Sequence, residues 1–252
     1  MPDFRFILDE YRPAPMNMAL DEAVMRLARE QTTPTIRFYG WKPSAISIGY
    51  FQSLEEEVDL KKCKDLGVDF VRRITGGGAV FHDAELTYSF VCMENSNVVP
   101  KKIIDSYQKI CGALVNGFGE MGLEAKFMPI NDIIVNGKKI SGNAQTRREG
   151  VVLQHGTILL EVDVDKMFSL LKVPSEKMRG KLIEDVKQRV TSVEQQLNRK
   201  MSFGRLAEFM KTGFEKEFSA RLLPGKFSQK ELDLAKKIEK ERFGNNDWSF
   251  KR

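Results

Sequence analysis

The order of the predicted elements places the tightest limit on how this chain folds. Runs rich in β-branched and aromatic residues predict strands, and they lie mostly before Asp163: TIRFYGW, AISIGYF, VDFVRRIT, LTYSFVC and VVLQHGTILLEVD. Beyond Asp163 the sequence becomes helical and charged, and a last helix is predicted over roughly 229–243. Strands followed by helices, without an internal repeat or a long linker, indicate an α+β fold in a single domain over residues 1–252.

Two helices are predicted among the strands. Asn17 is placed to cap the helix in MALDEAVMRLARE, because its side-chain oxygen can accept from first-turn N–H groups. The second helix ends near Gly122 and carries an apolar stripe at helical spacing, made of Tyr107, Ile110, Cys111, Leu114, Phe118 and Met121. Since Cys111 lies on that stripe, we expect a buried core residue rather than a nucleophile.

Composition excludes several classes of function. The formal net charge is +5, and no basic stripe is interleaved with aromatic residues, so no nucleic-acid ligand is expected. No apolar run approaches the roughly 20 residues of a membrane span. The acidic, proline-interrupted start MPDFRFILDEYRPAP does not resemble a signal peptide. Three cysteines without metal spacing favour a reducing cytoplasm.

The stretch RRITGGGAVFHD contains three consecutive glycines directly after a predicted strand. Such a run lets the backbone approach a ligand and turn its N–H groups toward an anion. Arg72 and Arg73 before it and His82 after it favour an anion site. The alternative is a loop whose glycines only supply positive φ angles. The run matches neither GxxxxGK[ST] nor GxGxxG.

Asn136-Gly137 between two apolar-rich runs predicts a two-residue β-hairpin. In that register the facing pairs are Val135 with Lys138, Ile134 with Lys139, and Asp132 with Ser141. Asp132, Lys139 and Ser141 would then share one face and line a cleft; the alternative is an ordinary surface ion pair. His155, the second histidine, lies in another polar strand and could equally be a satisfied core histidine.

Three of these segments together resemble the lipoate-protein ligase A family, within the lipoyl/octanoyl/biotinyl transferase superfamily. They are RRITGGGAVFHDAELTYSF, NDIIVNGKKISGNAQTRREG and LQHGTILLEVD, and the resemblance extends from about residue 16 to residue 193. It implies a fold of mixed, mostly antiparallel sheets flanked by helices, like that of class II aminoacyl-tRNA synthetases. It also implies an ATP- and Mg²⁺-dependent ligase that forms lipoyl-AMP from lipoate and transfers the lipoyl group to an acceptor lysine.

The resemblance also assigns roles to particular residues. The lipoyl and adenylate pocket would be lined by Arg73, Thr75, Gly76, Gly77, Gly78 and His82, and completed by Ser141, Gly142 and His155. Asn131 and Asp132 would help to hold the nucleotide, with Asp132 at Mg²⁺ or phosphate. Lys139 would be the central catalytic lysine and would offset the charge of the reacting groups. We expect the face of residues 86–90 and the strand near Trp41 to accommodate the eight-carbon chain.

The implied partners are apo lipoyl domains of 2-oxoacid dehydrogenases or the glycine cleavage H protein. Family members often carry an accessory domain, and the helical tail over 225–252 resembles the segment that leads into it, so a separate partner subunit is expected. The alternatives are an octanoyltransferase acting on octanoyl-acyl carrier protein, a lipoyl amidotransferase, and a non-catalytic lipoyl-adenylate binding protein. Octanoyltransferases use a cysteine acyl acceptor, and the matching loops KFMPINDIIVNG and HGTILLEVD contain none, so the ligase is the main expectation.

Overall fold

The computed structural model describes residues 1–173 and 176–251. The strands are β1 (Asp3–Arg12), β2 (Thr35–Trp41), β3 (Ala45–Ile48), β4 (Asp69–Arg72), β5 (Val80–His82), β6 (Glu85–Met93), β7 (Ala125–Met128), β8 (Asp132–Val135), β9 (Lys138–Arg148), β10 (Val151–Leu159) and β11 (Arg221–Pro224). The α-helices are α1 (Ala14–Leu27), α2 (Leu54–Glu57), α3 (Leu60–Asp65), α4 (Ile103–Glu120), α5 (Val164–Leu170), α6 (Glu176–Arg189), α7 (Val193–Leu197), α8 (Phe203–Phe218), α9 (Gln229–Ile238) and α10 (Asn246–Ser249).

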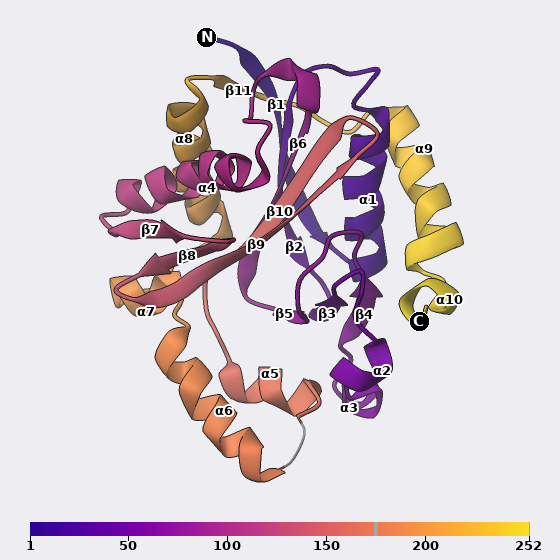
Figure 1. The fold of residues 1–252 in the computed structure, drawn as a ribbon, viewed down its shortest axis with the longest axis vertical. Coiled ribbons are helices and arrows are strands. Elements are labelled where there is room, and N and C mark those ends of the chain that lie inside the picture. The colour runs from indigo at the N-terminus through magenta and orange to yellow at the C-terminus, as the bar shows by residue number, and fades with distance from the viewer. Residues whose placement is uncertain (174–175, 252) are drawn as a thin grey trace.

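In the described part of the chain, eight strands form one sheet in the order β11-β1-β2-β6-β10-β9-β8-β7. From β2 to β7 each neighbouring pair is antiparallel, whereas β1 is parallel to both β11 and β2. A smaller sheet, β4-β3-β5, lies below the large one in Figure 1. The predicted α+β class with mixed, mostly antiparallel sheets is therefore confirmed.

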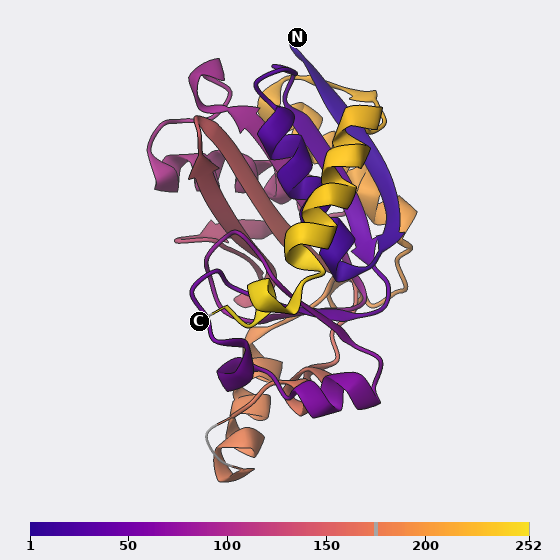
Figure 2. The ribbon, with the colours of Figure 1, turned by 90° about the vertical axis from the view of Figure 1, so that its right-hand side faces the viewer.

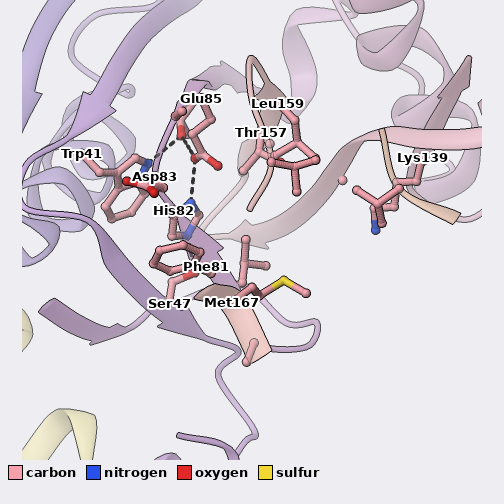
Figure 3. A pocket seen from close by; sticks show the side chains of 18 of the residues that line it. Trp41, Ser47, Phe81, His82, Asp83, Glu85, Lys139, Thr157, Leu159 and Met167 are labelled. Atoms are coloured by element: carbon pink, nitrogen blue, oxygen red, sulfur yellow. Dashed lines mark hydrogen bonds and ion pairs between the residues drawn. The ribbon is translucent and has the colours of Figure 1, made fainter. Parts of the chain in front are cut away.

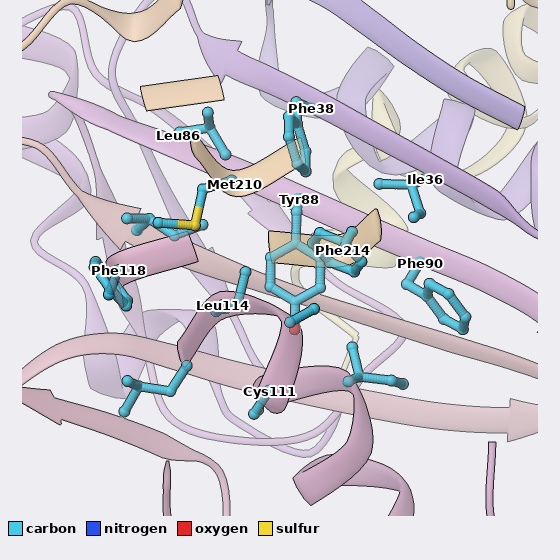
Figure 4. Packing of buried hydrophobic residues seen from close by; sticks show 14 of the residues in the cluster. Ile36, Phe38, Leu86, Tyr88, Phe90, Cys111, Leu114, Phe118, Met210 and Phe214 are labelled. Carbon is cyan, nitrogen blue, oxygen red and sulfur yellow. The ribbon is translucent and has the colours of Figure 1, made fainter. Parts of the chain in front are cut away.

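Helices cover both faces of the large sheet (Figures 1 and 2). On one face, α4 and α8 enclose an apolar core around Tyr88, Phe90 and Phe214 (Figure 4). On the other face, α1 packs on the sheet and α9 runs beside α1. The predicted alternation in β6 is present, but both of its faces are buried, because helices lie on each side of it. No helix of the described residues has the length and apolarity that a bilayer span requires.

Helix α1 begins earlier than the sequence predicts. It starts at Ala14 and has Pro15 in its first turn, where the N–H that proline lacks needs no partner. Asn17 is therefore not the cap. Its buried amide instead donates to the Gly40 carbonyl at 2.9 Å and accepts from Arg37 Nη2 at 2.7 Å.

The predicted hairpin turn is present, with Asn136 and Gly137 at φ 50° and 75°. Two predicted pairs are confirmed, Val135 with Lys138 and Ile134 with Lys139. The third pair is wrong, because a bulge follows Lys139 and shifts the register by one residue. As a result, Asp132 faces Gly142 and Ser141 faces Ile133.

The last predicted helix is confirmed as α9, which continues through a π-helical turn over Glu239–Phe243. The following helix, α10, is fixed to the smaller sheet by Arg72. The Arg72 guanidinium donates to the carbonyls of Trp248 and Ser249 at 3.0 and 2.9 Å, and Trp248 Nε1 donates back to the Arg72 carbonyl at 2.8 Å. Arg72 therefore serves the fold, contrary to the expectation that it marks an anion site.

Candidate active site

A cavity of about 970 Å³ is lined by residues of both sheets and of α5 and α6. Figure 3 shows part of its wall. Its apolar lining includes Met18, Trp41, Phe81, Leu159, Val164, Met167, Val186 and Val190. Its polar lining includes Ser47, Arg73, His82, Glu85, Thr87, Lys139, Asn143 and His155. A pocket of this size with few converging polar groups is typical of a small-molecule site.

The cavity brings together most of the residues that the sequence singles out. The predicted residues in its wall are Arg73, Gly77, Gly78, His82, Asn131, Lys139, Gly142 and His155. Thr75, Gly76, Asp132 and Ser141 do not line it. Thr75 and Ser141 are buried, and the bulge after Lys139 places Ser141 opposite Ile133 in the strand pair instead of opposite Asp132.

The prediction of which residues accommodate the acyl chain is only partly correct. Trp41 lines the cavity, but Leu86 and Phe90 point into the core beneath α4 and α8. The residues of this strand that do reach the cavity are Glu85 and Thr87, on the opposite face. The apolar wall comes instead from β5, β10, α5 and α6, which sequence spacing alone could not bring together.

The glycine run approaches the neighbouring strand very closely. A Cβ at Gly49 would lie 1.9 Å from the Gly77 carbonyl oxygen, and Gly77 has a φ of +99°. Both positions therefore require glycine. The run brings backbone to the cavity wall, as the sequence predicts.

Arg73 holds this loop in place. Its Nη2 donates to the carbonyls of Gly76 and Gly78 at 2.8 and 2.7 Å, and its Nη1 donates to the Ser47 carbonyl at 3.0 Å. Burial lowers the pKa of Arg73 to about 10. The guanidinium is charged at neutral pH, and its main contacts are with the protein backbone.

His155 lies beneath the loop in a buried network. Its Nε2 is 2.7 Å from Thr75 Oγ1 and its Nδ1 is 3.3 Å from Asp21 Oδ2. Arg37 donates to the other oxygen of Asp21 at 2.9 Å. Burial lowers the pKa of His155, although Asp21 acts against that shift. Burial would raise the pKa of Asp21, but the hydrogen bond with His155 and the charge of Arg37 bring it below its usual value.

His82 belongs to a second buried network. Its Nδ1 is 2.7 Å from Glu85 Oε1 and its Nε2 is 2.7 Å from Ser47 Oγ. Trp41 stacks on the imidazole with ring centres 4.0 Å apart. Figure 3 shows the contact between His82 and Glu85, with Lys139 well apart from both. Sequence reasoning missed Ser47 and Glu85, although the spacing of Glu85 three residues after His82 was visible.

Lys139 and Asp132 form the predicted pair at the more exposed part of the site. The ammonium nitrogen lies 2.7 Å from Asp132 Oδ1, an ion-pair distance, although that oxygen has no partner with hydrogen-bond geometry. The side chains are 42% and 33% exposed. A Cβ at Gly142 would lie 2.9 Å from Lys139 Cε, so the glycine leaves room for the lysine. Thr191 N also donates to the Lys139 carbonyl at 2.8 Å, which anchors the segment between α6 and α7.

The side chains do not by themselves form a site for the Mg²⁺ that the resemblance implies. Magnesium is usually held by one or two carboxylates together with substrate phosphates, and Asp132, the carboxylate assigned to it, is the partner of Lys139. Across residues 1–173 and 176–251, no three His, Cys, Asp or Glu side chains are grouped to hold a metal ion.

The three cysteines, Cys63, Cys92 and Cys111, are free and buried, and none of them lines the cavity. Burial raises the pKa of the three thiols to about 11, 12 and 12 respectively. Cys111 is a core residue under β10, as the sequence predicts, and its sulfur accepts from Gln154 Nε2 at 3.7 Å. None of the three is placed to be an acyl acceptor.

Curated relatives match the chain over nearly its whole length. The octanoyltransferase LipM of Brevibacillus brevis is 36% identical over 276 aligned positions and covers 100% of both chains. The LipM of Geobacillus kaustophilus is 37% identical and covers 99% of this chain and 98% of its own. The main expectation of an ATP-dependent lipoate ligase is therefore wrong, because these relatives are octanoyltransferases.

Solved structures of lipoate-protein ligases share the fold. The bi-partite ligase of an archaeal lipoylation system from Thermoplasma acidophilum superposes with a TM-score of 0.92 at 31% identity, covering 100% of this chain and 98% of that one. A lipoate-protein ligase A bound with ATP gives 0.85 at 30% identity, with 98% of each chain covered. The family model described as the lipoyl protein ligase A/B catalytic domain matches residues 13–215. The chain therefore belongs to the lipoyl protein ligase A/B catalytic domain family.

Proposed function

We propose that this chain transfers an octanoyl group from the thioester of acyl carrier protein to a lysine of an acceptor domain such as a lipoyl domain or H protein. The observation that carries the proposal is the cavity, which combines an apolar wall with buried polar groups at one part and Lys139 at another. The full-length match to octanoyltransferases supports it. We further place the reaction in the cytoplasm, where free thiols such as these three persist.

The apolar wall suits a medium-length acyl chain. Trp41, Phe81 and Met167 contribute large apolar surfaces to one continuous cavity. Burying each methylene contributes about 0.8 kcal/mol, so an octanoyl tail supplies a substantial part of the donor affinity. A short acyl group such as acetyl would leave most of this wall uncovered.

Lys139 supplies a positive charge where donor and acceptor enter. Its side chain is more exposed than those of Arg73, His82, Glu85 and His155, and it forms an ion pair with Asp132 on the neighbouring strand of the hairpin. We place there the anionic part of the donor, the phosphate that links the acyl-bearing arm to the carrier protein. An ammonium fixed by a neighbouring carboxylate binds such a group as a point charge.

The proposal is tested by intact-mass spectrometry of an apo acceptor domain. The acceptor is incubated with the chain and octanoyl-acyl carrier protein, without nucleotide, and we expect a gain of one octanoyl group. The Lys139→Met variant should lower the rate by roughly 10–100-fold, less than a fully buried donor because water screens the exposed charge. Lys138→Met is the matched control, since Lys138 neighbours Lys139 but does not line the cavity.

Two results would contradict the proposal. A gain that requires free fatty acid and ATP would show activation of the acid instead of transfer from a thioester. Binding of the donor without any gain on the acceptor would indicate a binding protein. Repeating the reaction with a candidate accessory subunit added separates a missing partner from a missing activity.

A further inference from the structure

The cavity contains an ordered chain of three buried side chains, Ser47, His82 and Glu85. Ser47 Oγ is 2.7 Å from His82 Nε2, and His82 Nδ1 is 2.7 Å from Glu85 Oε1. All three residues line the cavity, and Ser47 is only 1% exposed. We propose that Ser47 takes the acyl group from the donor as an ester, with His82 as the base and Glu85 as its positioning residue. This inference rests on the proposed acyl transfer.

The neighbouring groups fix the direction of both hydrogen bonds that join Ser47, His82 and Glu85. A carboxylate can only accept, so Nδ1 of His82 carries the proton that is shared with Glu85. Nε2 is then an acceptor. Arg73 Nη1 can only donate, and it donates to Ser47 Oγ at 3.0 Å, so the serine proton points to His82. Nucleophile, base and orienting carboxylate are therefore arranged as nucleophilic catalysis requires.

The carboxylate of Glu85 is fixed by a further hydrogen bond on one oxygen and, within the part of the chain that the structure describes, is unpaired on the other. Its Oε1 also accepts from Thr87 Oγ1 at 2.7 Å, and Thr87 in turn accepts from Trp41 Nε1 at 2.7 Å. Its Oε2 is buried and has no hydrogen-bond partner among the described residues. Leaving a buried charged oxygen unpaired is costly, and the carboxylate can offset that cost during reaction by stabilising an imidazolium at His82.

Trp41 also favours an imidazolium at His82, through its contact with the face of the imidazole ring. Its indole stacks on His82 at an angle of 14°. An aromatic face attracts a cation placed over it, so the stack favours the imidazolium that forms when His82 takes a proton. The same stack fixes the orientation of the imidazole toward Ser47.

The chain offers no cysteine for this role. All three cysteines are outside the cavity wall, and burial raises their pKa values to about 11–12. Ser47 is a side-chain hydroxyl of the wall that has an acceptor imidazole in contact with it. It therefore supplies the nucleophile that the matching loops lack.

The reaction consists of two balanced steps. Ser47 Oγ attacks the thioester carbonyl, the C–S bond breaks, and the serine proton passes through His82 to the departing thiolate, which leaves as a thiol. The neutral amine of the acceptor lysine then attacks the ester. The C–N bond forms, the C–O bond breaks, and His82 returns the amine proton to Ser47 Oγ. No oxidant, reductant or nucleotide is consumed.

The test is to trap the ester. The whole chain is mixed with octanoyl-acyl carrier protein without acceptor, quenched in acid and mapped by peptide mass spectrometry. We expect one octanoyl group on the peptide with Ser47, stable to neutral hydroxylamine, which cleaves thioesters faster than oxygen esters. An octanoyl group on a cysteine or on Lys139, or full transfer to the acceptor without any enzyme ester, would overturn the inference.

Variants separate this inference from the proposed function. Ser47→Ala should lower transfer to the acceptor by at least about 10³-fold, whereas Ser47→Cys should form a hydroxylamine-sensitive acyl-enzyme. Ser44→Ala is the matched control, since Ser44 donates to Asp83 at 2.6 Å outside the chain of three. If Ser47→Ala transfers octanoyl at a rate near that of the unmodified chain, the serine inference fails while the proposed function stands.

Glu85→Gln tests the positioning role. Glutamine keeps the shape but removes the charge behind His82, so the imidazolium loses stabilisation and the acid limb of the pH–rate profile for acylation should move to lower pH. The neighbouring charged or titratable groups Arg73, His155, Tyr39, Asp83 and Lys166 are unchanged in this variant. A lower rate with an unmoved acid limb would contradict the role.

Discussion

His155 couples the stability of the fold to pH. Burial lowers its pKa below the usual 6.5, even though Asp21 acts in the opposite direction. Below about pH 6.5 the unfolded chain therefore binds a proton that the folded chain resists, and stability is lost as the pH falls. Asp21 acts in the same direction at lower pH. Its pKa in the folded chain lies below the usual 3.8, and the stability that it contributes is lost as the pH falls through that lowered pKa.

We therefore predict that the free energy of unfolding is constant above about pH 6.5 and decreases below it. Urea denaturation between pH 5 and pH 8 measures this. In His155→Gln the decrease should be reduced, while stability at pH 8 falls through the altered contact with Thr75. Equal slopes below pH 6.5 in the two proteins would show that another group dominates the acid response.

At the scale of elements, α4 and α8 approach each other through glycines. A Cβ at Gly213 would lie 2.2 Å from the Ala113 carbonyl oxygen and 2.4 Å from Gly117 N. Backbone atoms cannot move aside as a flexible side chain can, so the helices would have to separate. Gly204, in the same helix α8, has no heavy atom within 4 Å of the corresponding position.

We predict opposite effects for the same substitution at these two positions. Gly213→Ala should destabilise the fold by about 1–3 kcal/mol through overpacking. Gly204→Ala should stabilise it by about 0.5–1 kcal/mol, because alanine loses less backbone entropy in a helix. Chemical denaturation of both variants at pH 8 measures the difference, and changes of the same sign would refute the close helix contact.

The hairpin shows what local sequence can predict about an element. The turn follows from Asn136 and Gly137, which tolerate the positive φ angles of a tight hairpin. The bulge does not follow from local sequence, because it depends on Ile133 and Ile140 both lying in the core that is shared with α4 and α8. That packing is decided by segments far away in the sequence, so the predicted partner of Asp132 was wrong by one residue.

At the scale of the molecule, the sequence predicted the α+β class and most of the segments that form the cavity. It could not predict which side chains meet there. Ser47 contacts His82 because β3 pairs with β5 across more than 30 positions of sequence. The roles of α5 and α6 in the wall also depend on tertiary packing, and the glycine run alone gave no sign of them.

We propose that the acyl group comes from a thioester and not from an activated free acid, and a competition between the two donors distinguishes these sources. The chain and an apo acceptor domain are offered unlabelled octanoyl-acyl carrier protein together with deuterated octanoate and Mg-ATP, and the mass of the modified acceptor identifies the donor. We predict unlabelled octanoyl on the acceptor lysine. Deuterated octanoyl on that lysine would contradict the claim.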